Sequence, residues 1–114
     1  MEKVTKYRQL IKKILEDYEA MANRSRRTEG METHAVFDET RDRYMVFETG
    51  WWVKKRVRSI TLYVRLANSK FWIEEDWTKN GITTELLQIG VPKEDIVLAF
   101  HPPEMRQHTE FAIA

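Results

Sequence analysis

The chain has 114 residues, enough for one compact domain with a single core and too few for two ordinary ones, so residues 1–114 are expected to form one domain. Hydrophobic residues make up 42% and charged residues 32% of it, as in soluble globular proteins, and the net charge of +1 provides no overall field that would attract nucleic acid. The absence of cysteine excludes disulfides, thiolate nucleophiles and thiolate metal sites, and no apolar run resembles a membrane span or a signal-peptide core, so we expect a cytoplasmic protein without membrane contacts.

Residues 3–22 are predicted to form a long amphipathic helix. Apolar side chains recur there at a spacing of three and four, which places them on one helical face: Val4, Tyr7, Ile11, Ile14, Leu15, Tyr18 and Met21. A helix of about 20 residues spans roughly 30 Å and has to bury such a stripe, for which a sheet is the natural partner. The polar segment 23–30 ends the helix.

The pattern then changes to the alternation of β-strands. Strands are predicted at residues 33–38 and 44–49, which flank a polar link of hairpin length and stop at Gly50. Residues 59–66 alternate most clearly, and their even positions are expected in the core: Ile60, Leu62, Val64 and Leu66. A short loop leads to a strand at 70–76, which completes a four-stranded antiparallel meander.

A second, shorter helix is predicted at residues 82–89. Gly90 follows it as a left-handed C-terminal cap, and Pro92 prevents its continuation. The apolar run 96–100 is short and suited to burial on both faces. Together these elements predict an α+β fold in which a long N-terminal helix packs on an antiparallel sheet of four to five strands, with a short second helix.

The end of the chain is expected to be structural. His101 precedes two prolines, which lack the backbone donors that a further strand would need, so we interpret it as the end of a buried strand. The apolar tail 109–114 is expected to dock as a hairpin-like segment. Arg106 is expected to fold back toward an acid or toward the terminal carboxylate.

Many separate positions match one known family in order and spacing. They are Gly50-Trp51, Arg56-Val57, Lys70-Phe71-Trp72-Ile73, Gly81-Ile82, Glu85-Leu86, Gly90-Val91-Pro92-Lys93-Glu94-Asp95-Ile96-Val97-Leu98, Phe100, Pro103, Arg106 and Thr109-Glu110-Phe111-Ala112-Ile113-Ala114. On these residues the chain resembles the XisI-like family, the fdxN element excision controlling factors of cyanobacteria, from the leading helix to the last residue.

The resemblance implies a small α+β domain that assists programmed excision of a DNA element while nitrogen-fixing heterocysts differentiate. It implies action beside a site-specific recombinase and a nuclease-like companion protein (XisH-like), as a controlling factor and not as the recombinase. No catalytic residue set comes with the family, so no position here inherits a catalytic role.

Two short stretches depart from the family pattern. Tyr63-Val64-Arg65 stands where the family usually shows a His-x-Asp-like triplet on the outward face of the third strand. Asp76-Trp77-Thr78 replaces the common Asp-Gly-Thr after the fourth strand. If the outward face binds a partner, this chain is therefore expected to prefer a different one.

Metal chemistry finds little support in the sequence. A site that joins His34, His101 and His108 to Asp38 or Asp42 would lack the short ligand spacing that anchors zinc sites. We therefore expect no metal site.

Carboxylate chemistry is the other catalytic hypothesis. Two close acids can raise one pKa enough for general acid work, and Glu74 and Asp76 would share a face of the fourth strand, with Glu75 between them. A solvated strand end explains the same residues, and neither a phosphate-binding glycine loop nor a nucleophile motif accompanies them. The sequence therefore favours a non-catalytic protein without a cofactor.

Direct DNA binding is the alternative function. One stretch combines basic groups, which pair with phosphates, with indoles, which stack on bases: Trp51, Trp52, Lys54, Lys55, Arg56 and Arg58. Adjacent residues of a strand face opposite sides, so one of the two indoles is expected in the core. Solvated surface is the other interpretation of the basic group at residues 54–58, and also of a second basic group at residues 24–27.

Protein contact is the preferred function. Tyr63, Arg65, Trp72 and Trp77 fall together if the third and fourth strands pair, and protein interfaces are enriched in these residue types. The structural alternative is that the second helix covers this face. We predict that the face docks the nuclease-like companion, or that a second copy of the chain associates through a sheet edge as a homodimer.

Overall fold

The computed structural model of the chain describes residues 2–24 and 30–114. Residues 25–29, which belong to the predicted polar segment and include most of the second basic group, lie outside the described residues. The elements follow in the order α1 (Glu2–Arg24), β1 (Met31–Asp38), β2 (Arg43–Trp52), β3 (Lys55–Ala67), β4 (Lys70–Asp76), α2 (Ile82–Ile89), the 3-10 turn η1 (Lys93–Asp95), β5 (Ile96–Leu98) and α3 (Pro103–Arg106). The strands form one sheet in sequence order, antiparallel except for the parallel pair β4 and β5. The predicted α+β fold is confirmed, with a mixed sheet that is mostly antiparallel.

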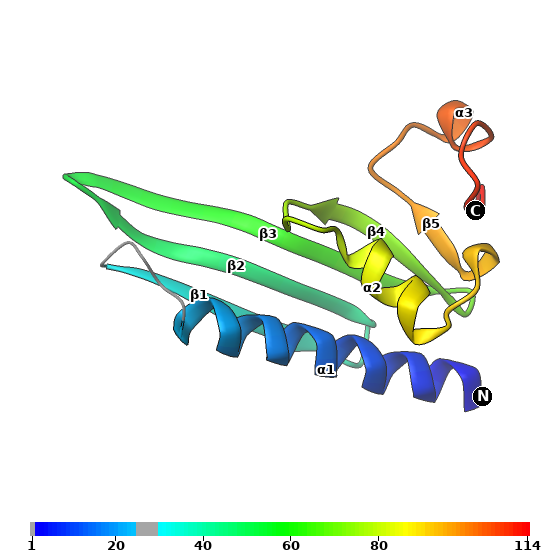
Figure 1. Cartoon of the computed structure of the whole chain (residues 1–114), viewed down its shortest axis with the longest axis horizontal. Helices are drawn as coiled ribbons and strands as arrows, with labels where there is room; N and C mark the ends of the chain where they lie inside the picture. The colour runs from blue at the N-terminus through cyan, green and yellow to red at the C-terminus, as the bar shows by residue number, and fades with distance from the viewer. Residues whose placement is uncertain (1, 25–29) are drawn as a thin grey trace.

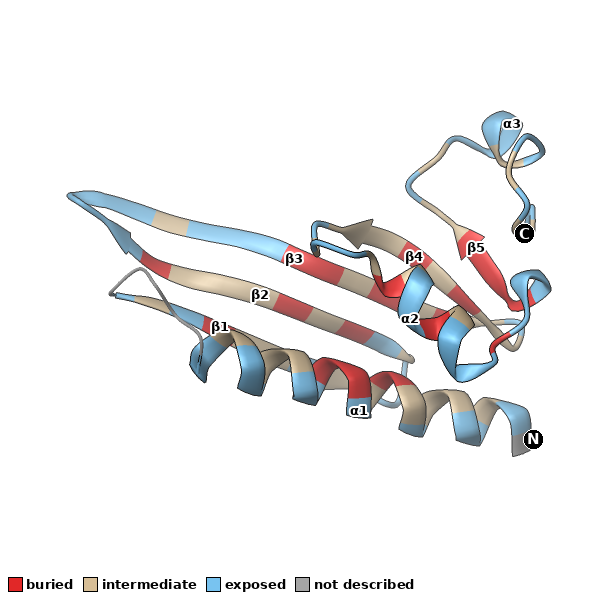
Figure 2. Ribbon diagram, in the orientation of Figure 1, coloured by how far each residue is buried: buried red, intermediate tan, exposed pale blue. Residues whose placement is uncertain are grey.

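The helices α1 and α2 lie on the same face of the sheet (Figure 1). The predicted stripe of α1 provides Ile11, Ile14 and Leu15, each at most 5% exposed, whereas Met21 near the helix end is exposed. α2 adds Leu86 to the same hydrophobic cluster, and the buried residues gather where helices and strands overlap (Figure 2). No helix of the described residues combines the length and the apolar character that a bilayer span requires.

β2 and β3 form a longer hairpin than predicted. Gly50 does not end a strand but lies inside β2, which runs on to Trp52, and β3 begins at Lys55. The glycine permits the close approach of the neighbouring strand, since a Cβ atom there would collide with the Gly30 carbonyl oxygen and lie 2.7 Å from the Met31 Cα. Because β2 and β3 are this long, the end of the hairpin extends past the C-terminal end of α1 (Figure 1).

A β-bulge in β3 changes which residues face the core. Val46 pairs with Leu62 but Phe47 pairs with Ile60, so Thr61 is an extra residue between two pairs. Thr61, predicted to point outward, is therefore buried. Ile60, predicted in the core, is 40% exposed on the opposite face. Strict alternation of the sequence cannot anticipate such a shift, because a one-residue slip moves every following side chain to the other face.

The chain beyond β4 departs most from the prediction. α2 ends as predicted at Gly90, whose φ of 110° supplies the left-handed cap. Because this helix carries the chain across before β5 begins, β5 pairs in parallel with β4. The expected hairpin-like arrangement of the tail 109–114 is wrong: the short helix α3 precedes the tail, and a single parallel bridge between Val97 and Ala112 joins the tail to β5. β5 is also shorter than the predicted apolar run, and Phe100 is exposed.

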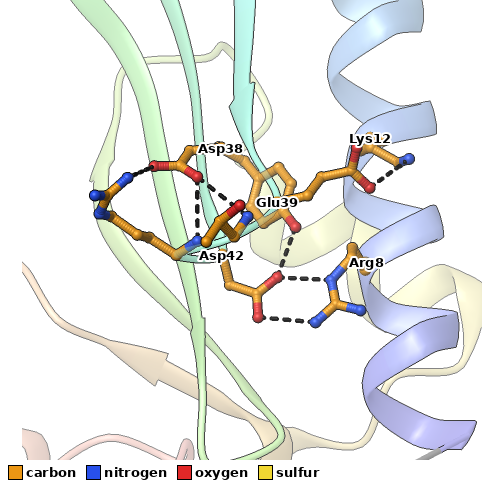
Figure 3. A network of polar contacts seen from close by, with 8 residues as sticks. Arg8, Lys12, Asp38, Glu39 and Asp42 are labelled. Carbon is orange, nitrogen blue, oxygen red and sulfur yellow. Dashed lines mark hydrogen bonds and ion pairs between the residues drawn. The ribbon is translucent and has the colours of Figure 1, made fainter.

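Polar contacts attach α1 to the turn between β1 and β2 (Figure 3). The Arg8 guanidinium donates to both carboxylate oxygens of Asp42 at 2.7 and 2.9 Å, and the Tyr44 hydroxyl donates to Asp42 at 2.7 Å. Lys12 pairs with Glu39 at 2.9 Å. The hydrogen bonds from Arg8 hold the pKa of Asp42 below its usual range, and burial, followed by the bond to Asp42, raises the pKa of Tyr44.

The N-terminal part of α1 is attached to the other side of the fold. Buried Asp95 accepts a hydrogen bond from the Tyr7 hydroxyl at 2.5 Å and forms an ion pair with Lys3 at 2.8 Å. Burial, followed by this bond, raises the pKa of Tyr7. The N-terminal half of the long helix is therefore fixed by polar contacts to two parts of the fold, the turn between β1 and β2 and the turn η1.

Candidate functional site

The sheet face opposite α1 and α2 carries exposed apolar side chains. Directly paired residues of neighbouring strands share a face, so the strand register shows which of these side chains are neighbours. Two rows cross β1, β2 and β3 in this way, with Val36, Met45 and Tyr63 in one and His34, Phe47 and Ile60 in the other. We call these six residues the outer-face patch.

The outer-face patch is apolar and partly open to solvent. Val36 is 45% and Ile60 40% exposed, and the other four side chains are partly buried. The His34 ring lies 5.0 Å from the Phe47 ring and its Nε2 hydrogen bonds to the Thr49 hydroxyl at 2.9 Å. None of the six side chains is a carboxylate, a lysine or an arginine. A pleated surface of this kind can be buried by another protein without leaving a charge unpaired.

Sequence reasoning missed most of this patch, although a signal was present. Residues 44–47 are apolar at odd and even positions alike, whereas a strand with one solvated face should alternate. The even residues Tyr44 and Val46 are fully buried beneath the helices, and the odd residues Met45 and Phe47 belong to the patch. A strand that is apolar on both faces indicates that both faces are covered, and here the described chain covers one of them.

The predicted partner residues Arg65 and Trp72 do come together, beside the patch. They pair across β3 and β4, with the guanidinium 5.4 Å from the ring centroid. Arg106 approaches the same ring at 5.7 Å, the Trp72 indole donates to a backbone oxygen at 3.0 Å, and Glu74 pairs with Arg65 at 2.8 Å. Arg65 and Trp72 therefore already have partners within the chain. They border the outer-face patch, and Trp72 contacts the C-terminal segment through Arg106.

Tyr63 and Trp77 have other positions. Tyr63 belongs to the patch and pairs with Glu75 of β4. Trp77 is 75% exposed, and its indole donates to the Glu75 carboxylate at 2.7 Å. The helix α2, on the face of α1, leaves this side of the sheet open (Figure 1). Trp77 is therefore placed at the rim of the outer-face patch.

Arg106 finds different partners from those predicted. It donates to the backbone oxygens of His101 and Ala99 at 3.0 and 3.3 Å, and more weakly to that of Ile113 at 3.4 Å. Lys70, from β4, donates instead to a backbone oxygen of the last residue, Ala114, at 2.6 Å. The backbone carbonyl oxygens that have no strand partner beyond the end of β5 accept hydrogen bonds from Arg106, in place of the acidic group that was expected to bind it.

The end of the β2–β3 hairpin, residues 50–59, is the second candidate surface, and we call it the arm. Trp51 is 53% and Trp52 58% exposed, so the expectation that one of them belongs to the core is wrong. The reason is the length of the hairpin, whose end lies past the helix layer (Figure 2), so that no helix covers residues 51 and 52. Trp51 pairs with Arg56, whose guanidinium lies 5.3 Å from the indole ring.

The residues considered for metal or acid–base chemistry lie apart from one another. His34 belongs to the outer-face patch, while His101 follows β5. Glu74 is bound to Arg65, whereas Asp76 accepts a hydrogen bond from the first backbone amide of α2 at 2.7 Å, so the two carboxylates have separate structural roles. Within residues 2–24 and 30–114, no group of three or more histidines and acids is arranged to hold a metal ion.

A groove between α1 and the start of α2 was not indicated by the sequence. It encloses about 440 Å³, with Ile14, Tyr18, Leu62 and Ile82 among the apolar residues that line it. Its charged lining residues are two acids and two bases: Asp17, Glu85, Arg24 and Lys79. The balanced charge favours neither an anion nor a cation.

Known proteins resemble the chain over nearly its whole length. The family described as XisI protein matches residues 1–113. The crystal structure of the fdxN element excision controlling factor XisI from Anabaena variabilis is 44% identical, covers 98% of this chain and 99% of its own, and has a TM-score of 0.83. A XisI-like protein from the same organism is 29% identical over 97% of this chain and 99% of its own, with a TM-score of 0.88. A comparison with curated proteins gives no match. On this similarity of sequence and structure, the chain belongs to the XisI family.

Proposed function

We propose that the chain is a non-catalytic accessory factor that controls excision of a DNA element by binding a partner protein on its outer-face patch. The role in excision control is supported by the 44% identical structure, which is that of an fdxN element excision controlling factor. The contact with a protein is supported by one observation: two paired rows of apolar side chains lie on a sheet face that α1 and α2 leave open.

The hydrophobic effect gives such a face a reason to bind. Full burial of one large aliphatic or aromatic side chain is worth about 1.5–3 kcal/mol, and the six patch residues start from partial exposure. Contiguous apolar patches with polar rims mark interaction sites on soluble proteins. Here the rim includes Arg65 and Trp72, whose own partners hold them in place, and the exposed indole of Trp77.

The occupant that we propose is the nuclease-like companion (XisH-like) that the family resemblance implies. A protein surface suits the patch better than a nucleic acid does, because the six side chains include no lysine or arginine to neutralise phosphates. Tyr63 and Arg65 stand where the family usually has a His-x-Asp-like triplet, so these positions would set the preference for one particular companion.

The test compares two isoleucines in a binding assay with that companion. Ile60 in the patch is 40% exposed and Ile89 on α2 is 52% exposed, so Ile60→Lys and Ile89→Lys make the same change on different surfaces and neither opens a core cavity. We expect Ile60→Lys to weaken binding at least about tenfold in titration calorimetry, because a desolvated lysine would be left unpaired in the interface. Ile89→Lys should bind as the wild type does.

Two results would contradict this function. Equal affinities for the two variants would show that the companion binds elsewhere. A concentration-dependent dimer of the isolated chain that Ile60→Lys abolishes, measured by light scattering after size-exclusion chromatography, would assign the patch to a second copy instead.

A further inference from the structure

The arm combines an unusual sequence with an unusual position. Residues 50–59 contain four basic residues and no acid, although the whole chain carries a net charge of only +1. These residues lie at the end of the hairpin that extends past α1 (Figure 1), where nearly all of the ribbon is exposed (Figure 2). The four cations are Lys54, Lys55, Arg56 and Arg58.

Both faces of the arm carry an indole beside a cation. Trp51 and Arg56 are paired and stacked on one face, and Arg58 shares that face because it is two residues further along the strand. Trp52 pairs with Lys55 on the other face. The arm therefore presents positive charge and aromatic surface to both sides, as a ribbon surrounded by its ligand requires.

Among the described residues, no acid forms an ion pair with a cation of the arm. Seven cations elsewhere in the described residues have carboxylate partners, such as Arg8 with Asp42 and Arg65 with Glu74. Four exposed cations that form no ion pair with a described acid complement a ligand that carries several regularly spaced anions.

The tip of the arm is apolar at a conformational cost. The hairpin turns through two residues, and the first of them, Val53, has a φ of 58° and is 85% exposed. Such positions favour glycine or asparagine, and a β-branched side chain there is strained. An apolar tip flanked by cations suits a nucleic-acid groove, where positive groups contact phosphates and an apolar side chain meets sugars or base steps.

We propose that the arm binds duplex DNA, with its four cations on the phosphates and with Trp51, Trp52 and Val53 against the groove. Two-stranded ribbons have the dimensions to enter the major groove, and arginine pairs with phosphate through two parallel hydrogen bonds. The arm shares no residue with the outer-face patch, so DNA binding by the arm is tested with substitutions that leave the six patch residues unchanged.

The experiment measures binding of the full chain to a fluorescent duplex of about 30 base pairs by anisotropy, from about 50 to 200 mM salt. Lys55→Glu is compared with Lys6→Glu, which makes the same charge change on the exposed side of α1. We expect Lys55→Glu to weaken binding at least about fivefold and to lower the slope of log Kd against log salt by about one, because a phosphate contact is lost. Lys6→Glu should remain within about twofold of the wild type, since it removes only general charge.

An uncharged substitution separates the contribution of the indoles to DNA binding from that of the four cations. Trp52→Ala should weaken binding and leave the salt slope unchanged, because an indole releases no counterions. The proposal is overturned if the wild-type chain fails to bind the duplex at about 50 mM salt, or if the two glutamate variants lose affinity equally. Binding through the arm to vesicles that contain phosphatidylserine, without binding to the duplex, would also overturn it in favour of a membrane ligand.

Discussion

Asp42 shows how a single residue joins the helix to the sheet. It accepts two hydrogen bonds from Arg8 and one from the hydroxyl of fully buried Tyr44 (Figure 3). Tyr44→Phe should lower the free energy of unfolding by about 1 kcal/mol, the usual net value of one such bond. Urea unfolding measures the change, and an unchanged midpoint would mean that the hydroxyl contributes nothing to stability.

The same carboxylate makes stability depend on pH. Arg8 lowers the pKa of folded Asp42, so the contribution of this group is complete above the unfolded pKa of about 4 and is lost as the pH falls through the lower folded value. Asp42→Asn keeps the side-chain shape and tolerates the φ of 54° at this position. The variant should be less stable than the wild type at pH 7, and the difference should close as the pH falls below 4. A stability difference between variant and wild type that is as large below pH 4 as at pH 7 would contradict the ion pair between Arg8 and Asp42.

Single residues were predictable where local pairing decides their position. The contact between Arg65 and Trp72 follows from the short loop that joins their two strands. The left-handed cap at Gly90 follows from the position of this glycine directly after a helix. Arg106 and Ile60 were not predictable, since their partners depend on how the tail folds and on a bulge. Neither event leaves a periodic trace in the sequence.

At the scale of elements, Gly50 sets the spacing between β1 and β2. Gly50→Ala places a Cβ against the Gly30 carbonyl and the Met31 backbone, neither of which is a flexible side-chain end. We expect a loss of about 1–3 kcal/mol in thermal or urea unfolding, as for an overpacked site. The amide of Trp51, which donates to the Gly30 oxygen at 3.3 Å, should lose protection from hydrogen exchange while amides of β4 keep theirs.

Wild-type stability and wild-type protection at Trp51 in that variant would show that the two strands separate without cost. The prediction therefore tests the strand packing and not the conformational freedom of glycine, because Gly50 has no unusual backbone angle.

Helices and strands were predictable to different degrees. The stripe of α1 and the signals around α2 gave both helices correctly, because a period of 3.6 residues and a glycine cap are local properties. The parallel pairing of β5 and the length of the β2–β3 hairpin were missed. Both depend on where the chain returns in space, which alternation alone does not encode.

At the scale of the whole molecule, stability should differ between the body and the arm. The strands beneath the helices hold fully buried residues such as Val46 and Val64, whereas Trp51 and Trp52 are mostly exposed. Hydrogen exchange should open amides of the arm far more readily than those of the central strands, since few apolar contacts hold the ribbon. Protection at Trp52 equal to that at Val64 would show that the arm folds as part of the core.

The candidate surfaces were predictable only in part. The sequence identified the basic and aromatic residues of the arm and the rim residues around Trp72, because composition reveals residue types. The alternation of residues 59–66 could not show that the hairpin extends past α1 or that Ile60 faces away from the helices, so most of the outer-face patch was missed. These properties belong to the assembled molecule.

The overhanging arm also makes the protein an electric dipole. Residues 54–58 hold four positive charges, which leaves 15 basic against 18 acidic residues in the rest of the chain, so +4 at one end is opposed by −3 elsewhere. A nearly neutral molecule of this kind gains little speed from the field of a polyanion, but the field exerts a torque on it. The arm would be turned toward the polyanion before contact, so its orientation on arrival would be selected even though its rate of approach is not.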